Sequence, residues 1–166
     1  MATPIYRAGT ATAVAPVTAP PTTAAHFALY NTALAGGKSL SLMTVETFCS
    51  ASAGAALIIQ PYAHVSANPV AQMTGTVATA IQSLVPTGLP SVAAVASAVT
   101  ITADSVWHPC GESANFGTGT TTIAVGTSSL VTGLYVIPPQ GLFSLAIVCS
   151  AINSATLKCF VTWTEA

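Results

Sequence analysis

Charged side chains are the scarcest feature of this sequence. Its 166 residues include three lysines and arginines and four aspartates and glutamates, for a formal net charge of −1. A folded monomer of this mass exposes roughly 7,500 Å² of surface, which leaves about one charge per 1,000 Å². Soluble domains usually have about a quarter of their surface charged. We therefore expect much of this surface to be covered by other protein, in an oligomer or a larger assembly.

Several classes of function are excluded by what the sequence lacks. There is no basic patch to neutralise phosphates, so we expect no binding to nucleic acid. There is no apolar run of 18 residues, so we expect no membrane span. The first residues lack the basic start and the continuous apolar stretch of a secretion signal. The protein is therefore expected to be made and assembled in a cytoplasm.

Catalytic and cofactor-binding motifs are also lacking. The only cluster of ligand-type residues is His108-Pro109-Cys110-Gly111-Glu112, and a zinc site needs three or four converging ligands. Asp104 and His108 could join a serine in a triad, but no GxSxG elbow is present. Neither GxxxxGK[ST] nor GxGxxG occurs. We predict that the protein is not an enzyme and holds no metal or cofactor.

Cysteine is sparse for a chain of this length. The four residues, Cys49, Cys110, Cys149 and Cys159, include no CxxC pair. We interpret them as small apolar core residues, because free cysteine is among the most buried residue types. A disulfide between Cys149 and Cys159 is the alternative.

The sequence does contain strong β-strand patterns, and the clearest lies near the C-terminus. If residues 142–150 fold back on 156–164 about Asn153-Ser154, one face of the pair is apolar and the other is mostly polar. The opposed apolar pairs are then Leu145 with Trp163, Ile147 with Val161, and Cys149 with Cys159. This pattern predicts a half-buried antiparallel hairpin.

Further short strands are predicted along the chain, separated by glycine and proline turns. They cover Ala25–Tyr30, Ser39–Phe48, Ala55–Tyr62, Val70–Leu84, Ser91–Thr102, Asp104–His108, Thr120–Gly126 and Leu134–Ile137. Pro61 is expected to end the third of these. Glu46 lies on an apolar parity, where it would either face outward or pair with Lys38 or Lys158. The whole pattern predicts an all-β fold, an antiparallel β-sandwich of jelly-roll type.

Residues 1–24 differ from the rest in composition. They are rich in threonine, alanine and proline, with prolines at 4, 16, 20 and 21. We predict that they form an extended N-terminal arm and that 25–166 form the β-sandwich domain. Such an arm can make few contacts within its own subunit, so we expect it to bind a neighbouring subunit. Its anchors would be Ile5, Tyr6, Arg7, Val14 and Val17.

Two stretches resemble a known class of protein. ALYNTALAGGKSLSLMTV (28–45) combines an aliphatic-aromatic-Asn opening with a glycine turn and an alternating strand. IPPQGLFSLAIVCS and CFVTWTE form a strand, a Pro-Pro-Gly corner with Gln140 inserted, and a strand ending in Trp-x-Glu. Together they are similar to the beginning and end of small virion proteins of tailed bacteriophages.

This resemblance implies a jelly-roll or sandwich subunit of the virion, commonly a trimeric capsid decoration (cement) protein. The hypothesis is then a homo-oligomer, a trimer, on the capsid surface, with the arm contacting the major capsid protein. It implies no catalytic residue.

Two other functions remain open. One is a tail, neck or fibre-base subunit, which differs from the first hypothesis only in location. The other is a carbohydrate-binding module, which would need an exposed aromatic platform. Trp107, beside His108, is the lone candidate for that platform.

Overall fold

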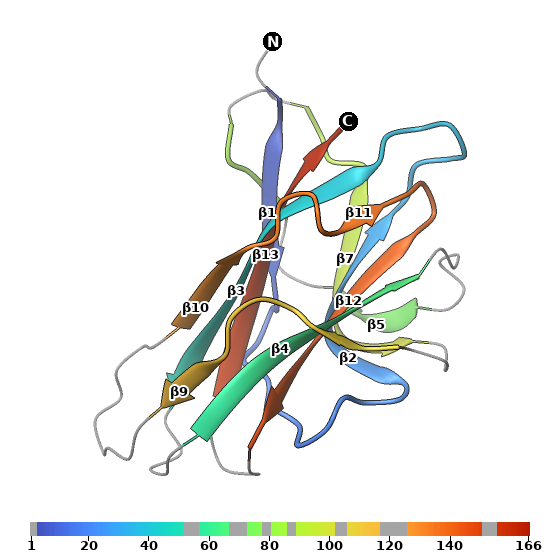
Figure 1. Cartoon of the computed structure of the whole chain (residues 1–166). Helices are drawn as coiled ribbons and strands as arrows, with labels where there is room; N and C mark the ends of the chain where they lie inside the picture. Colours follow the sequence, from blue (N-terminus) through green and yellow to red (C-terminus); the bar gives the residue numbers. More distant parts are fainter. Residues whose placement is uncertain are drawn as a thin grey trace.

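All regular secondary structure in the described part of the chain is β-strand. The computed structural model describes residues 3–51, 57–66, 73–77, 81–85, 89–101, 106–116, 126–150 and 156–166. No helix occurs among these residues. The strands form two antiparallel sheets packed against each other, as the sequence predicts (Figure 1). The exposed surface of 7882 Å² agrees with the area expected for a monomer.

Thirteen strands are described. In chain order they are β1 (Ile5–Gly9), β2 (Ala24–Asn31), β3 (Leu40–Ala51), β4 (Leu57–Ser66), β5 (Met73–Val77), β6 (Gln82–Ser83), β7 (Ala93–Ile101), β8 (His108–Pro109), β9 (Ala114–Phe116), β10 (Gly126–Leu130), β11 (Val136–Ile137), β12 (Leu142–Cys149) and β13 (Thr156–Glu165). Sheet A has the order β10-β3-β13-β1-β6, with β11 also paired to β3. Sheet B has the order β5-β7-β2-β12-β4-β8, with β9 also paired to β4.

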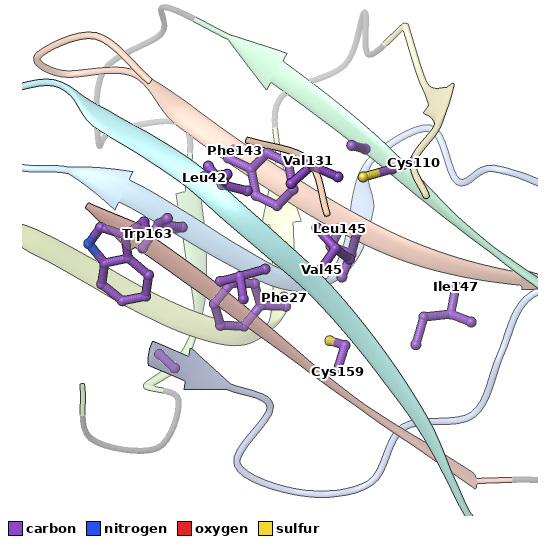
Figure 2. Packing of buried hydrophobic residues seen from close by; sticks show 14 of the residues in the cluster. Phe27, Leu42, Val45, Cys110, Val131, Phe143, Leu145, Ile147, Cys159 and Trp163 are labelled. Carbon is purple, nitrogen blue, oxygen red and sulfur yellow. The ribbon is translucent and has the colours of Figure 1, made fainter. Parts of the chain in front are cut away.

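The main core lies between the sheets and is built mainly from inward-facing residues of the longer strands. In β13 the inward residues Leu157, Cys159, Val161 and Trp163 are all fully buried. Figure 2 shows side chains of β12 and β3 around those of β13. Period-2 alternation places such residues on one face of a strand, so the amphipathic strands can bury that face only against a second sheet.

The predicted C-terminal hairpin is wrong. Strand β12 pairs with β2 and β4 in sheet B, whereas β13 pairs with β1 and β3 in sheet A. The predicted parity is correct, because Leu145, Ile147, Val161 and Trp163 all face the core. These residues belong to facing sheets and not to neighbouring strands. Alternation determines which side chains point inward but not which strand lies beside which.

The prediction that 1–24 forms an arm outside the sandwich is wrong for residues 5–9. These residues form β1, which lies between β13 and β6. Tyr6 is 1% exposed, stacks on Trp163 with ring centroids 5.9 Å apart, and donates a hydrogen bond to the Leu89 carbonyl. An extended segment that contains apolar residues at alternate positions satisfies its backbone best inside a sheet.

Strand β4 continues through Pro61, contrary to the expected end there. The Pro61 carbonyl accepts a hydrogen bond from the Cys110 amide, on the side of β4 away from β12. In an antiparallel strand the N–H and C=O of one residue point the same way. The missing donor of Pro61 therefore faces the gap between β8 and β9, and the ladder with β12 loses nothing.

The cysteines occupy the core, as predicted. All four are free and buried. Cys149 ends β12 in sheet B and Cys159 lies in β13 of sheet A, so they are not cross-strand neighbours. The alternative of a disulfide between them is not what the structure contains.

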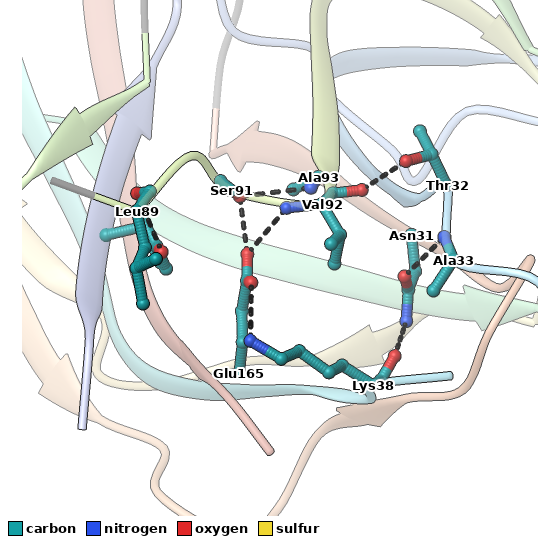
Figure 3. Close-up of polar contacts among 10 residues, drawn as sticks. Asn31, Thr32, Ala33, Lys38, Leu89, Ser91, Val92, Ala93 and Glu165 are labelled. Atoms are coloured by element: carbon teal, nitrogen blue, oxygen red, sulfur yellow. Dashed lines mark hydrogen bonds and ion pairs between the residues drawn. The ribbon is translucent and has the colours of Figure 1, made fainter. Parts of the chain in front are cut away.

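A buried carboxylate joins the end of β13 to the start of β7. Glu165 is 4% exposed, and its Oε1 accepts hydrogen bonds from the Ser91 hydroxyl and from the Val92 amide at 3.0 Å (Figure 3). The ammonium of Lys38 lies 4.0 Å from Oε2. Because a buried carboxylate needs such partners, Glu165 determines where the chain enters sheet B from the loop before β7.

We expect deletion of residues 1–9 to abolish cooperative folding. The deletion removes β1 and the ring of Tyr6, which exposes Trp163 and the edge of β13. A thermal melt followed by near-UV circular dichroism measures this. Deletion of residues 1–3, which precede β1, is the control and should keep the wild-type transition. A cooperative melt within a few degrees of wild type in the 1–9 deletion would contradict the assignment of β1 to the sandwich.

Glu165→Ala is expected to lower the free energy of unfolding by about 2–4 kcal/mol, because two partly buried donors, the Ser91 hydroxyl and the Val92 amide, lose their acceptor. Glu165→Gln keeps an acceptor oxygen and should lose less. Urea titration of both variants measures the difference. Equal losses in the two variants would show that the hydrogen bonds to Oε1 contribute little.

Candidate functional site

Most ionised side chains of the described residues are paired within the chain. Arg7 pairs with Glu46, and Lys38 with Glu165. Among the described residues, Lys158 and Glu112 take part in no ion pair, and Asp104 lies outside that part of the chain. The surface therefore offers a partner very little charge.

The outer face of sheet A contains the first of these pairs. Glu46 was expected to face outward or to pair with a lysine; it does face outward, but its partner is Arg7 on β1. The Arg7 guanidinium also lies 4.7 Å from the centroid of the Phe160 ring, so it is engaged in a cation–π contact as well. The predicted anchor Arg7 thus has partners in its own sheet.

Two outward-facing phenylalanines on the same face lie against glycines. Phe160 is paired with Gly9, and Phe48 with Gly126. A Cβ atom at Gly9 would lie 2.4 Å from the Phe160 ring, and one at Gly126 would lie 2.5 Å from the Phe48 ring. The rings therefore use space that only glycine leaves, and they meet edge to face at 5.9 Å. These contacts stabilise sheet A and leave no open ring platform there.

A pocket of about 510 Å³ opens between the edges of the two sheets, and we call it the edge pocket. Its wall comes from the end of β4, the segment leading to β8, and β11. The lining residues are Ala63, His64, Val65, Ser66, Val106, His108, Leu134, Tyr135 and Val136. The apolar rim is exposed: Val65 is 38%, Val136 52%, Val106 67% and Leu134 74% exposed. Among the described residues that line it there is no carboxylate, lysine or arginine.

Two titratable groups in and behind the edge pocket, the Cys110 thiol and the Tyr135 hydroxyl, are shifted toward their protonated forms. Burial raises the pKa of Cys110 to about 11, although the hydroxyl of Tyr135 hydrogen-bonds its thiol. Burial also raises the pKa of Tyr135, so both groups stay protonated at neutral pH. A protonated thiol is a poor nucleophile. His108 is exposed on β8, and the described residues contain no group of three potential metal ligands.

Trp107, the candidate sugar platform, packs inward over sheet B. Its ring lies 5.7 Å from that of His64, and it contacts a second apolar cluster on the outer face of sheet B. That cluster consists of Ala25, Ala28, Tyr30, Ala96, Val99, Ile101 and Leu142. The indole nitrogen is buried without a hydrogen-bond partner. Trp107 therefore covers apolar surface instead of presenting a flat ring to solvent.

The five predicted partner-binding residues do not form one exposed surface. Tyr6 is in the core, and Ile5 and Arg7 are partly buried within β1. Val14 forms an isolated bridge with Leu157 of β13, and Val17 a parallel bridge with Val148 of β12. All five therefore contact the chain's own sandwich.

The exposed rim of the edge pocket was not predicted from the sequence, although the strand pattern of residues 134–137 indicates part of it. Leu134 and Val136 share one parity of a predicted strand, and Tyr135 and Ile137 share the other. Ile137 is fully buried, and Tyr135 packs against the core. Once one parity faces inward, the other must face outward, so two large apolar side chains are necessarily exposed.

No family model, curated protein or solved structure matches this chain. None of the described residues belongs to a helix long and apolar enough to cross a membrane.

We expect no cysteine of the native protein to react quickly with a thiol reagent at pH 8. All four thiols are buried, and burial also raises the pKa of Cys159 to about 12. Absorbance after addition of Ellman's reagent measures the reactive thiols. The four thiols should titrate only after unfolding in guanidinium chloride. One rapidly labelled native thiol would contradict the described packing.

Proposed function

We propose that this protein is a structural subunit of a virion, a capsid decoration (cement) protein of a tailed bacteriophage. It acts as a homo-oligomer, a trimer, on the capsid surface. It binds the major capsid protein through apolar and main-chain contacts. Its work is mechanical, because each contact buried across a joint between capsomers adds free energy that opposes the internal pressure of the packaged DNA.

The order of the strands supports this proposal. Three strands extend the ends of the sheets, namely β7 and β5 beyond β2 in sheet B and β6 beyond β1 in sheet A. Without them and without β9 and β11, the sheets read β1-β13-β3-β10 and β2-β12-β4-β8. Consecutive strands cross from one sheet to the other except at β4 and β8. We infer that this is the double Greek key of a jelly roll, an architecture of viral capsid domains and also of lectins and cupins. Because one fold serves many functions, the choice among these functions depends on which side chains the surface exposes.

The exposed apolar side chains are the observation that carries the proposal. Among the described residues nine large ones are exposed: Leu34, Ile58, Val65, Leu84, Leu89, Val106, Leu130, Leu134 and Val136. By comparison, only two charged side chains of the described residues, Lys158 and Glu112, lie outside ion pairs. An exterior with so many apolar and so few charged groups is that of a protein covered by other protein.

The structure also changes which residues are proposed to make the contact. Since residues 5–17 already bind the chain's own sheets, the rim of the edge pocket replaces the arm as the proposed contact with a sister copy or the shell. Val65, Val106, Leu134 and Val136 gather there around one concave surface. Such an apolar contact should respond little to salt, because it contains few charges to screen.

The alternative of a tail, neck or fibre-base subunit shares all these surface properties and differs in its place in the virion. The alternative of a carbohydrate-binding module is not favoured by any described feature, because Trp107 is packed inward and the two outward phenylalanines lie against glycines and each other.

The test is occupancy of capsids assembled from the major capsid protein of the same virus. We expect occupancy to change less than about twofold between about 0.05 M and about 0.5 M salt. Leu134→Asp and Val136→Asp should each reduce occupancy at least tenfold, because a carboxylate cannot be buried unpaired at low cost. Ser128→Asp, at an exposed position of β10, is the matched control and should bind normally.

Cryo-electron microscopy of the loaded capsids measures occupancy directly. Steep loss of occupancy with salt, or full occupancy of both rim variants, would contradict the proposed contact. Density for the protein on the tail and none on the head would favour the alternative location.

A further inference from the structure

Residues 10–17 cross one end of the sandwich from sheet A to sheet B, and we call them the strap. At the first end, Val14 and Leu157 of β13 exchange two backbone hydrogen bonds, of 2.7 and 2.8 Å. At the second end, the Val17 amide donates to the Ile147 carbonyl at 3.0 Å, and the Cys149 amide donates to the Val17 carbonyl at 2.7 Å. The strap thus bonds to both sheets within a few residues.

His26 of β2, in sheet B, contacts both β12 and the strap at this end of the sandwich. The ladder between β2 and β12 ends at the pair Phe27 and Leu145. Beyond it, the Ile147 amide donates to Nδ1 of His26 at 2.8 Å, so the imidazole replaces a main-chain acceptor. The ring also hydrogen-bonds the backbone of Ala15, in the middle of the strap. One side chain therefore links β12 to the strap.

This geometry requires a neutral imidazole. A ring nitrogen accepts a hydrogen bond only while it has no proton, and a second proton on Nδ1 would face the Ile147 N–H directly. Burial, the larger influence, lowers the pKa of His26, whereas the bond to Ala15 opposes that change. A cavity of about 250 Å³ lies beside the ring, lined by Val17, Pro21, Ala24, Ala25, Ala98, Val99 and Thr100 as well as His26. A protonated ring can therefore move away from the Ile147 amide of β12 and into this cavity.

We propose that His26 is an acid-sensitive latch, and that its protonation releases the strap from β12 while the two sheets stay folded. The anchor at Val14 and Leu157 contains no ionisable group and stays in place. Release opens the end of β12 at Ile147 and Cys149, which then has unpaired backbone groups on the side away from β4. This inference does not depend on the proposed virion function.

No other described ionisable group accounts for the same response. The segments around the His26 ring contain no ionisable side chain. These segments are the strap, residues 21–25 and residues 98–100. On β12, Cys149 faces the core, and on β13 the nearest charge is Lys158, beside Leu157 on a strand of the other sheet.

The direction of the pH effect follows from linkage. With the strap released, the His26 ring titrates near its ordinary pKa of 6.5, and with the strap closed the pKa of His26 is lower. The released state therefore binds more protons below pH 6.5, and the closed state is favoured above it. The equilibrium constant for release should rise by at most about tenfold for each pH unit below 6.5.

Hydrogen exchange of the full chain tests the latch. Protection factors of the Val17 and Cys149 amides, corrected for intrinsic exchange, should fall several-fold between about pH 7.5 and about pH 5.5. Those of the β1 and β13 amides should stay constant. His26→Gln offers an uncharged acceptor and donor at every pH and should remove the pH dependence. His108→Gln, which changes the exposed histidine of the edge pocket, is the matched control and should keep it.

Constant protection at Val17 and Cys149 over this range would overturn the proposal, as would an unchanged pH response in His26→Gln. If His26→Gln does not fold, the imidazole nitrogen shifts of the wild-type protein decide instead. They should show the tautomer with the proton on Nε2 and a pKa below 6.5. A ring that titrates at or above its ordinary value would overturn the latch.

Discussion

The packing of β13 against β12 across the interior is the contact on which the rest of the structure depends. The inward side chains of β13, from Leu157 to Trp163, are fully buried, and so are Leu145 and Ile147 of β12. Fully burying each such side chain contributes about 1.5–3 kcal/mol. Neither sheet could cover this surface alone, so the inward face of each sheet is buried against the other. The strap and His26 then close the end of the sandwich where the two strands approach each other.

Most of the few charged side chains of the described residues form ion pairs within the sandwich. Both ion pairs of the described residues join elements of the sandwich: Arg7 with Glu46 joins β1 to β3, and Lys38 with Glu165 lies beside the start of β7. Charges used inside the chain are not available to keep its exterior hydrated. The exposed leucines and valines around the edge pocket are the surface through which we propose that the protein associates.

Sequence alone predicted the fold class and the inward parity of the C-terminal strands, because alternation is local. It did not predict the pairing of β12 and β13, which depends on how distant strands are ordered. Threonine, alanine and proline composition suggested an extended arm bound to a neighbouring subunit, yet Tyr6 of that segment completes the core beside Trp163. The edge pocket could have been anticipated in part from the parity of Leu134 and Val136. The latch at His26 could not, since it depends on where the ladder between β2 and β12 ends.

The central claim is that this sandwich exists with its apolar exterior covered by copies of itself. Native mass spectrometry of the purified, unmodified chain at micromolar concentration tests it most directly. The account predicts a species of three times the 16.5 kDa chain mass. A stable species at the mass of one chain, soluble and unchanged on concentration, would contradict it.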